Sequence, residues 1–121
     1  MTEGAGTSYA LLHNQERPLK MKTYVSHTWG EPIKEFDEAI KRSGEEGPFY
    51  ICAFSIYQNS ILSKGVTITE QLGSDPKFGV FATVLKISES MLVIPTNGCN
   101  MFTRLWCVYD TFFANHNGVR V

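Results

Sequence analysis

Pro48-Phe49-Tyr50-Ile51-Cys52-Ala53-Phe54 is a continuous apolar run bounded by chain breakers. A run of this kind is typical of a strand that is buried on both faces of a parallel sheet. Residues 22–27 are partly β-branched or aromatic and predict a strand before it. Residues 91–94 are apolar, are followed by Pro95, and predict a third strand after it. We expect these strands to form the centre of the fold.

Helices are predicted between the strands. Apolar residues recur at helical spacing, or next to helix-terminating glycines, in four segments. These segments are residues 33–42, 68–72, 78–85 and a stretch that begins near residue 102. Residues 119–121 resemble the start of a fourth strand. Strands that alternate with helices predict a parallel sheet with helices on both faces, so the expected class is α/β.

Size and composition narrow the classes of function. The chain has 121 residues, which suits a single domain, and 43% of them are hydrophobic. Charged residues make up 19% and the net charge is −1, so neither nucleic acid nor an anionic membrane is an expected partner. No apolar run approaches the ~20 residues of a membrane-spanning helix.

The two ends of the chain differ from its middle. Residues 1–20 are small and polar and predict a flexible arm without a signal peptide. Residues 21–121 form the expected domain. Its last strand lacks a covering helix, so we expect either that the domain is truncated at its C-terminus or that a partner covers the open edge. The three cysteines have no metal-like spacing, so we expect a reduced, cytoplasmic protein without a metal.

The last predicted helix carries an acidic residue at a notable position. Its apolar residues form one stripe at helical spacing, and a second, mixed set forms another face. The stripe consists of Phe102, Leu105, Tyr109 and Phe112, and the other face of Thr103, Cys107, Asp110 and Ala114. Asp110 therefore lies away from the stripe, either on a solvated surface or facing a cleft. Parallel sheets bind ligands outside the carboxyl ends of their strands, and this helix starts from such an end.

Three motifs occur in order at the predicted strand ends and on the last helix: Ser26–Gly30, Tyr50–Gln58 and Arg104–Asp110. Together they resemble the TIR (Toll/interleukin-1 receptor) superfamily. Plant-type members of that family carry Trp-Cys followed, three residues after the Cys, by Glu, and Trp106-Cys107-Val108-Tyr109-Asp110 has this spacing. The motifs are equally similar to the fungal heterokaryon-incompatibility domain, with His27 where that family has Tyr.

The resemblance implies a flavodoxin-like, three-layer α/β fold with a parallel sheet of four or five strands. It also implies self-association with like domains and signalling in stress or immunity. Many members cleave NAD at the nicotinamide–ribose bond with a Glu at the position of Asp110, so NAD would be a substrate and not a bound cofactor. The absence of a G-x-G-x-x-G motif argues against a tightly held redox dinucleotide.

Asp110 is the candidate catalytic residue of such an enzyme. Its side chain is shorter than Glu by one methylene, about 1.5 Å of reach. A misplacement of ~1 Å can lower a rate by roughly 100-fold, so weak activity or none is expected. The alternative is a non-catalytic module that acts through self-association. A phosphoacceptor domain on the same architecture fits poorly, because the first strand lacks an acidic end.

Further candidate binding residues lie near the strand ends. Trp29 could stack on nicotinamide or adenine, or simply cover the sheet edge. Gly30 would allow close approach of a ligand or make the turn. The remaining candidates are Ser26 and His27 for ribose or phosphate, Gln58 for the second strand's side of the cleft, and Cys107 beside Asp110. A nucleophilic role for Cys107 is disfavoured because the sequence places no histidine to activate it.

Overall fold

The computed structural model describes residues 5–59, 65–98 and 100–121. Its strands are β1 (Thr23–Ser26), β2 (Phe49–Ile51) and β3 (Ser90–Val93). The helices are α1 (Tyr9–His13), α2 (Ile33–Ser43), α3 (Cys52–Ser55), α4 (Ile68–Leu72), α5 (Val80–Ile87) and α6 (Leu105–His116), and a 3-10 turn, η1 (Met101–Thr103), precedes α6. The described chain is thus an α/β structure, as the alternating pattern predicts.

The three strands form one open parallel sheet in the order β2-β1-β3. Thr23 lies opposite Phe49 in β2 and opposite Ser90 in β3, so all three strands begin at the same edge. Strand β2 lies on one side of β1 and β3 lies on the other. The chain therefore moves in one direction along the sheet from β1 to β2, and in the opposite direction from β2 to β3. Ligands of open parallel sheets bind where the strand order reverses in this way, outside the carboxyl ends of the strands. In this protein that place is next to Ser26 and His27.

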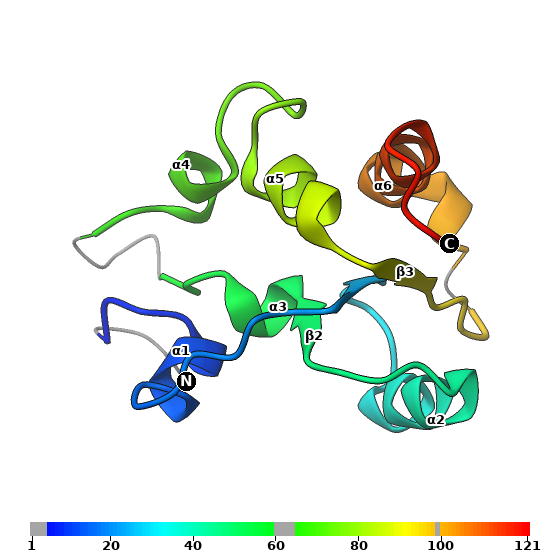
Figure 1. The fold of residues 1–121 in the computed structure, drawn as a ribbon, viewed down its shortest axis with the longest axis horizontal. Coiled ribbons are helices and arrows are strands. Elements are labelled where there is room, and N and C mark those ends of the chain that lie inside the picture. The colour runs from blue at the N-terminus through cyan, green and yellow to red at the C-terminus, as the bar shows by residue number, and fades with distance from the viewer. Residues whose placement is uncertain (1–4, 60–64, 99) are drawn as a thin grey trace.

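Helices cover both faces of the sheet (Figure 1). On one face α2 packs against Val25 and Ile94 through Phe36, which is buried. On the other face α5 and α6 pack side by side over Tyr24 and Met91. Tyr24 and Val25 are neighbours in β1 and point to opposite faces, as strand geometry requires. The result is the three-layer arrangement expected for a buried parallel sheet.

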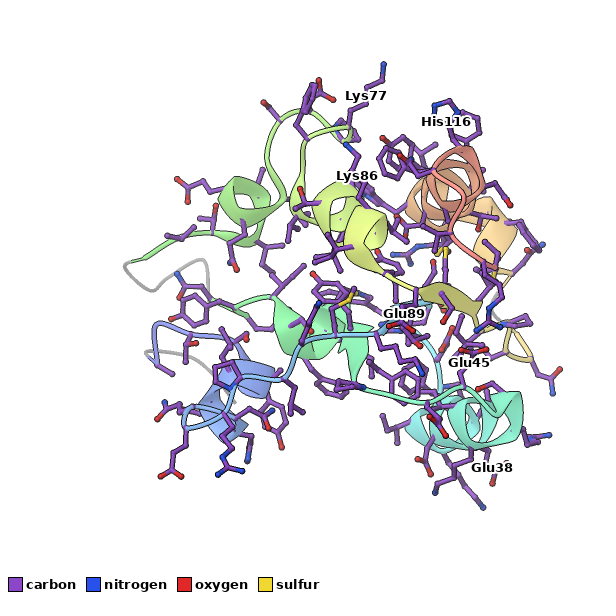
Figure 2. The ribbon with its side chains drawn as sticks, viewed as in Figure 1. Glu38, Glu45, Lys77, Lys86, Glu89 and His116 are labelled. Atoms are coloured by element: carbon purple, nitrogen blue, oxygen red, sulfur yellow. The ribbon has the colours of Figure 1, made fainter. Side chains whose placement is uncertain are left out.

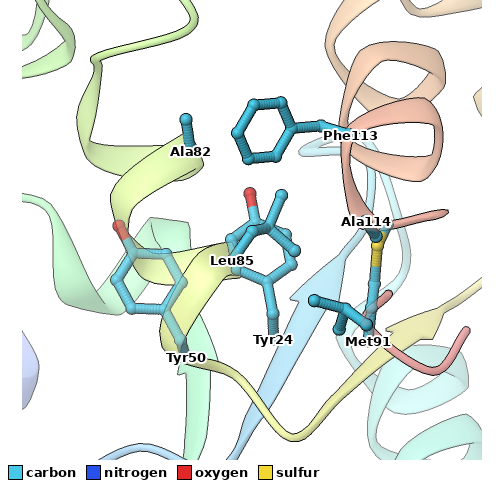
Figure 3. Packing of buried hydrophobic residues seen from close by; sticks show 8 residues of the cluster. Tyr24, Tyr50, Ala82, Leu85, Met91, Phe113 and Ala114 are labelled. Carbon is cyan, nitrogen blue, oxygen red and sulfur yellow. The ribbon is translucent and has the colours of Figure 1, made fainter. Parts of the chain in front are cut away.

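The larger core lies under α5 and α6 (Figure 3). Leu85 of α5 is completely buried there. Tyr24 of β1 stacks on Tyr50 of β2 with ring centroids 5.4 Å apart. Ala114 of α6 is also fully buried, and its small side chain lets the helix approach the sheet closely. This core holds α6 in a defined position over β1.

Two predicted strands are shorter than expected. The apolar run 48–54 is strand only to Ile51 and continues as helix α3, because an apolar run by itself does not distinguish strand from buried helix. The predicted fourth strand over 119–121 makes one isolated parallel bridge, between Arg120 and Ser90. The sheet of the described residues therefore has three strands, and the expected count of four or five is wrong for this part of the chain.

A polar cluster joins the C-terminal residues to the amino ends of the strands. The Arg120 guanidinium donates two hydrogen bonds to Glu45, at 2.8 and 3.0 Å, beside the end of α2 (Figure 2). Ser90 donates to the same carboxylate at 2.9 Å, and its hydroxyl lies 3.1 Å from that of Thr23. The hydrogen bond from Arg120 is the main reason that the pKa of Glu45 is lowered. Among the described residues, these contacts connect the C-terminal segment to the β3 edge, where a fourth strand was predicted.

Part of the N-terminal segment 1–20 has regular structure. Helix α1 begins after Ser8, whose hydroxyl accepts a hydrogen bond from the backbone N–H of Leu11. Its Tyr9 ring packs against Phe54 of α3 at 5.7 Å between centroids. Within the described ranges, no helix has both the length and the apolar character that a membrane span requires.

We predict that Leu85→Ala lowers the free energy of unfolding by about 2–5 kcal/mol, because it leaves a cavity in the core between α5 and the sheet. Urea unfolding followed by circular dichroism measures this change. The control is Leu19→Ala, which truncates a leucine that is 62% exposed and should cost no more than about 0.5 kcal/mol. Equal costs for the two variants would contradict the assigned core.

Candidate functional site

Helix α6 presents the face opposite to the one that its apolar stripe suggests. Asp110 and Cys107 are 5% exposed, and they face the sheet together with Phe113 and Ala114. Leu105 and Phe112 of the apolar stripe are 81% and 64% exposed. Apolar residues surround most of this helix, so their spacing alone did not identify the inner face. The interpretation of Asp110 as a solvated surface residue is therefore wrong.

Asp110 is held by two hydroxyl groups from the central strand. Tyr24 donates a hydrogen bond to Asp110 Oδ2 at 3.0 Å, and Ser26 donates to the same oxygen at 3.2 Å. Both donors lie on one face of β1 because they are two residues apart. Asp110 Oδ1 is buried and has no hydrogen-bond partner among the described residues. One oxygen is thus oriented by the protein, and the other is enclosed without a hydrogen-bond partner among the described residues.

Burial changes the acidity of this carboxyl group. Removal from water raises the pKa of Asp110 from 3.8 to about 6, and the hydrogen bonds from Tyr24 and Ser26 oppose that rise. The group is therefore mainly a carboxylate at pH 7 and mainly neutral below pH 6. Perturbed carboxyl groups that line a cavity are frequent at functional sites.

Asp110 lines a cavity of about 160 Å³ between the carboxyl end of β1 and helices α5 and α6. Its walls are mostly apolar or aromatic, with a few polar groups near the strand end. The lining residues are Tyr24, Val25, Ser26, His27, Trp29, Cys52, Ile56, Ile68, Leu72, Phe81, Arg104, Trp106, Cys107 and Asp110. An apolar cavity with a few convergent polar groups is the usual form of a small-molecule site.

The cavity collects residues from all three sequence motifs. Five of the seven candidates predicted from the sequence line it: Ser26, His27, Trp29, Cys107 and Asp110. The other two, Gly30 and Gln58, do not. Gly30 is exposed in the turn after β1. The predicted strand does not reach Gln58, because β2 ends at Ile51 and the chain continues as α3. The side-chain amide of Gln58 donates to the Ile56 carbonyl at 3.5 Å.

A sulfur and an imidazole lie side by side in the cavity wall. Cys52 Sγ is 3.6 Å from His27 Nε2, and the Trp29 indole N–H donates to the same sulfur at 3.3 Å. Burial raises the pKa of the Cys52 thiol and lowers that of His27, so both groups are neutral at pH 7. The sequence did not single out Cys52 as a site residue, since nothing in the linear order joins it to His27.

Other residues of the site also escaped prediction. Tyr24 could have been identified, because it precedes Ser26 by two residues and shares its face of the predicted strand. Trp106 is 42% exposed, and it lines the cavity beside Phe81 with ring centroids 5.7 Å apart. Burial is the main reason that the pKa of the Cys107 thiol is raised, and this thiol donates to the His27 carbonyl at 3.7 Å.

No group of three or more His, Cys, Asp and Glu side chains among the described residues could hold a metal ion. Comparison of the chain with protein-family models, with curated proteins and with solved structures finds no significant match. The residues around the cavity and the three sequence motifs are therefore the basis on which a function is proposed below.

We predict that Asp110→Asn stabilises the protein increasingly as the pH rises. The pKa of Asp110 is raised in the folded state. The contribution of this group to the free energy of unfolding is therefore most favourable below pH 3.8 and is lost as the pH rises through about 6. Urea unfolding at two pH values measures the difference between variant and wild type. Between pH 5 and pH 7.5, the free energy of unfolding of Asp110→Asn should increase relative to that of the wild type by about 1–1.5 kcal/mol.

The matched control for this experiment is Asp37→Asn, which removes an exposed carboxylate from α2. The difference in free energy of unfolding between Asp37→Asn and the wild type should stay nearly constant over the same pH interval. A difference for Asp110→Asn that is equally constant would show that this carboxyl group is not buried as described.

Proposed function

We propose that this chain is a TIR-like domain whose cavity binds the nicotinamide end of NAD, and that Asp110 promotes slow hydrolysis of the nicotinamide–ribose bond. The observation that supports this most directly is that Asp110 lines the cavity and that its Oδ1 has no hydrogen-bond partner among the described residues. It agrees with the motif resemblance, in which Asp110 stands at the catalytic position.

The size of the cavity favours one ring of the ligand. A cavity of roughly 150 Å³ is known to hold benzene, so about 160 Å³ suits a six-membered ring such as nicotinamide. The remainder of NAD would lie along the rim. The aromatic faces of Trp29 and Trp106 are partly exposed there, and the exposed Arg104 offers a cation that suits a phosphate group.

The chemistry requires a carboxylate near the ribose. Breaking the N-glycosidic bond builds positive charge on the sugar, as in glycoside hydrolysis. Tyr24 and Ser26 fix Oδ2, so Oδ1 can accept a ribose hydroxyl and stabilise the developing cation. Nicotinamide leaves with the electron pair of the bond, and water adds to the ribose. The raised pKa of Asp110 implies that turnover falls below about pH 6.

The second candidate function is a non-catalytic module that assembles with like domains. A specific surface favours it: the α6 outer face, formed by Phe102, Leu105, Val108 and Phe112, is apolar and solvent-exposed. Exposed apolar patches of this kind commonly mark interaction sites. This candidate is compatible with NAD binding, since the cavity lies against the inner face of α6.

The enzymatic proposal is tested by nicotinamide release from NAD at high protein concentration. We expect slow release by the wild type and at least a 100-fold decrease in Asp110→Ala. Asp110→Glu should increase the rate, because the longer side chain extends into the cavity toward the ribose. Asp37→Asn is the control carboxylate and should leave the rate unchanged.

Two outcomes would contradict this assignment. Release that persists in Asp110→Ala would exclude Asp110 as the catalytic group. Absence of NAD binding by the wild type in calorimetry would remove the nucleotide from the proposal altogether.

The assembly proposal is tested by sedimentation velocity over a range of concentrations. We predict that the wild type associates as its concentration rises and that Leu105→Lys weakens association by at least tenfold, because a charge enters the α6 outer face. Ile33→Lys is the matched control, since Ile33 is 69% exposed on α2. A wild type that stays monomeric, or equal effects of the two variants, would exclude this face as the interface.

A further inference from the structure

The sulfur–imidazole contact in the cavity wall has the geometry of an activated thiol. Cys52 Sγ and His27 Nε2 are 3.6 Å apart, which is within the range of hydrogen bonds to sulfur. The proposed hydrolysis of NAD does not use this pair. Both residues line the same cavity as Asp110.

The tautomer of His27 is determined by its second contact. His27 Nδ1 lies 3.2 Å from the Thr28 carbonyl oxygen, which can only accept a hydrogen bond. Nδ1 therefore carries the proton of the neutral ring, and the lone pair of Nε2 faces Cys52. A base that is oriented in this way by a third group is the usual arrangement next to a nucleophile.

Trp29 adds a donor on the other side of the sulfur. Its indole N–H points at Cys52 Sγ from 3.3 Å and favours the negative charge that forms when the thiol loses its proton. The thiol is protonated at rest because burial raises its pKa. It thus becomes a nucleophile only when a base removes its proton during reaction, and His27 is the base in position to do so.

The remaining walls indicate which electrophile fits. Ile56, Leu72 and Phe81 favour a small, neutral, largely apolar molecule. The buried Oδ1 of Asp110 has no partner among the described residues and would accept a hydrogen bond from an N–H group of that molecule. The negative charge of Asp110 at pH 7.5 would repel an anion. These features together favour an unsaturated amide over an unsaturated acid.

We propose that Cys52, with His27 as its base, forms a covalent adduct with small α,β-unsaturated amides that enter the cavity. The Cys52 sulfur bonds to the β-carbon of the amide while the thiol proton passes to His27 Nε2. The electron pair of the carbon–carbon double bond moves toward the carbonyl to give an enolate. His27 then returns the proton to the α-carbon. The addition has no leaving group and needs no oxidant or reductant.

The experiment measures the addition of acrylamide to each cysteine by peptide mass spectrometry at pH 7.5, in the folded protein and in urea. Urea provides the rate of an ordinary exposed thiol for the same peptide. We expect Cys52 to react at least tenfold faster in the folded protein than in urea, and Cys107 to react more slowly than in urea. The ratio of the acrylamide rate to the acrylate rate at Cys52 should also be higher in the folded protein than in urea.

His27→Gln should lower the rate at folded Cys52 by at least 100-fold, the usual contribution of a general base. His13→Gln, which removes an exposed histidine from α1, is the matched control and should leave that rate unchanged. Trp29→Phe removes the indole donor and should lower the rate about three- to tenfold. This second variant keeps the test decisive if His27→Gln does not fold.

A folded Cys52 that reacts no faster than in urea would overturn the proposal. So would a rate that is unchanged in both His27→Gln and Trp29→Phe. The adduct is detected by mass at Cys52 and needs no NAD, so this result is independent of nicotinamide release.

Discussion

The hydrogen bonds from Tyr24 and Ser26 to Asp110 join helix α6 to the central strand, and the rest of the site depends on them. They place the one buried polar side chain of α6 against β1, beside the apolar Phe113 and Ala114. A buried carboxylate is costly unless it is hydrogen-bonded, so the two hydroxyls lower the cost of this orientation, which the packing of Phe113 and Ala114 also supports. If α6 were turned to bury Leu105 and Phe112, Asp110 would become exposed and would be separated from the hydroxyls of Tyr24 and Ser26.

This orientation has consequences on both sides of α6. On the inside, Asp110 and Cys107 line the cavity at the carboxyl end of β1, and one carboxylate oxygen keeps no partner among the described residues. On the outside, three residues of the apolar stripe, Phe102, Leu105 and Phe112, are exposed, whereas Tyr109 packs against the core. A chain that buried only its most apolar face would have neither feature. The inner face of α6 thus combines one hydrogen-bonded carboxylate with the buried Cys107, Phe113 and Ala114, and the exposed apolar residues lie on its other side.

The cavity brings together two kinds of reactive group. Asp110 is raised in pKa by burial and provides a fixed negative charge at neutral pH. Cys52 and His27 are both neutral at pH 7 and lie 3.6 Å apart, in position for the proton transfer that we propose. The two groups approach the cavity from different elements, α6 for the acid and the β1 and β2 ends for the thiol pair. The small volume, about 160 Å³, admits one ring or one short chain at a time.

Local patterns in the sequence determined the α/β class, the parallel strands and helices such as Ile68–Leu72, because periodicity and chain breakers act over a few residues. Five of the seven candidate residues line the cavity, and three of them, Ser26, His27 and Trp29, lie at the carboxyl end of β1, where ligands of parallel sheets bind. Only the tertiary structure decided the inner face of α6, the end of β2 at Ile51 and the contact between Cys52 and His27. Each depends on packing or hydrogen bonds between residues far apart in the chain, which a local pattern does not record.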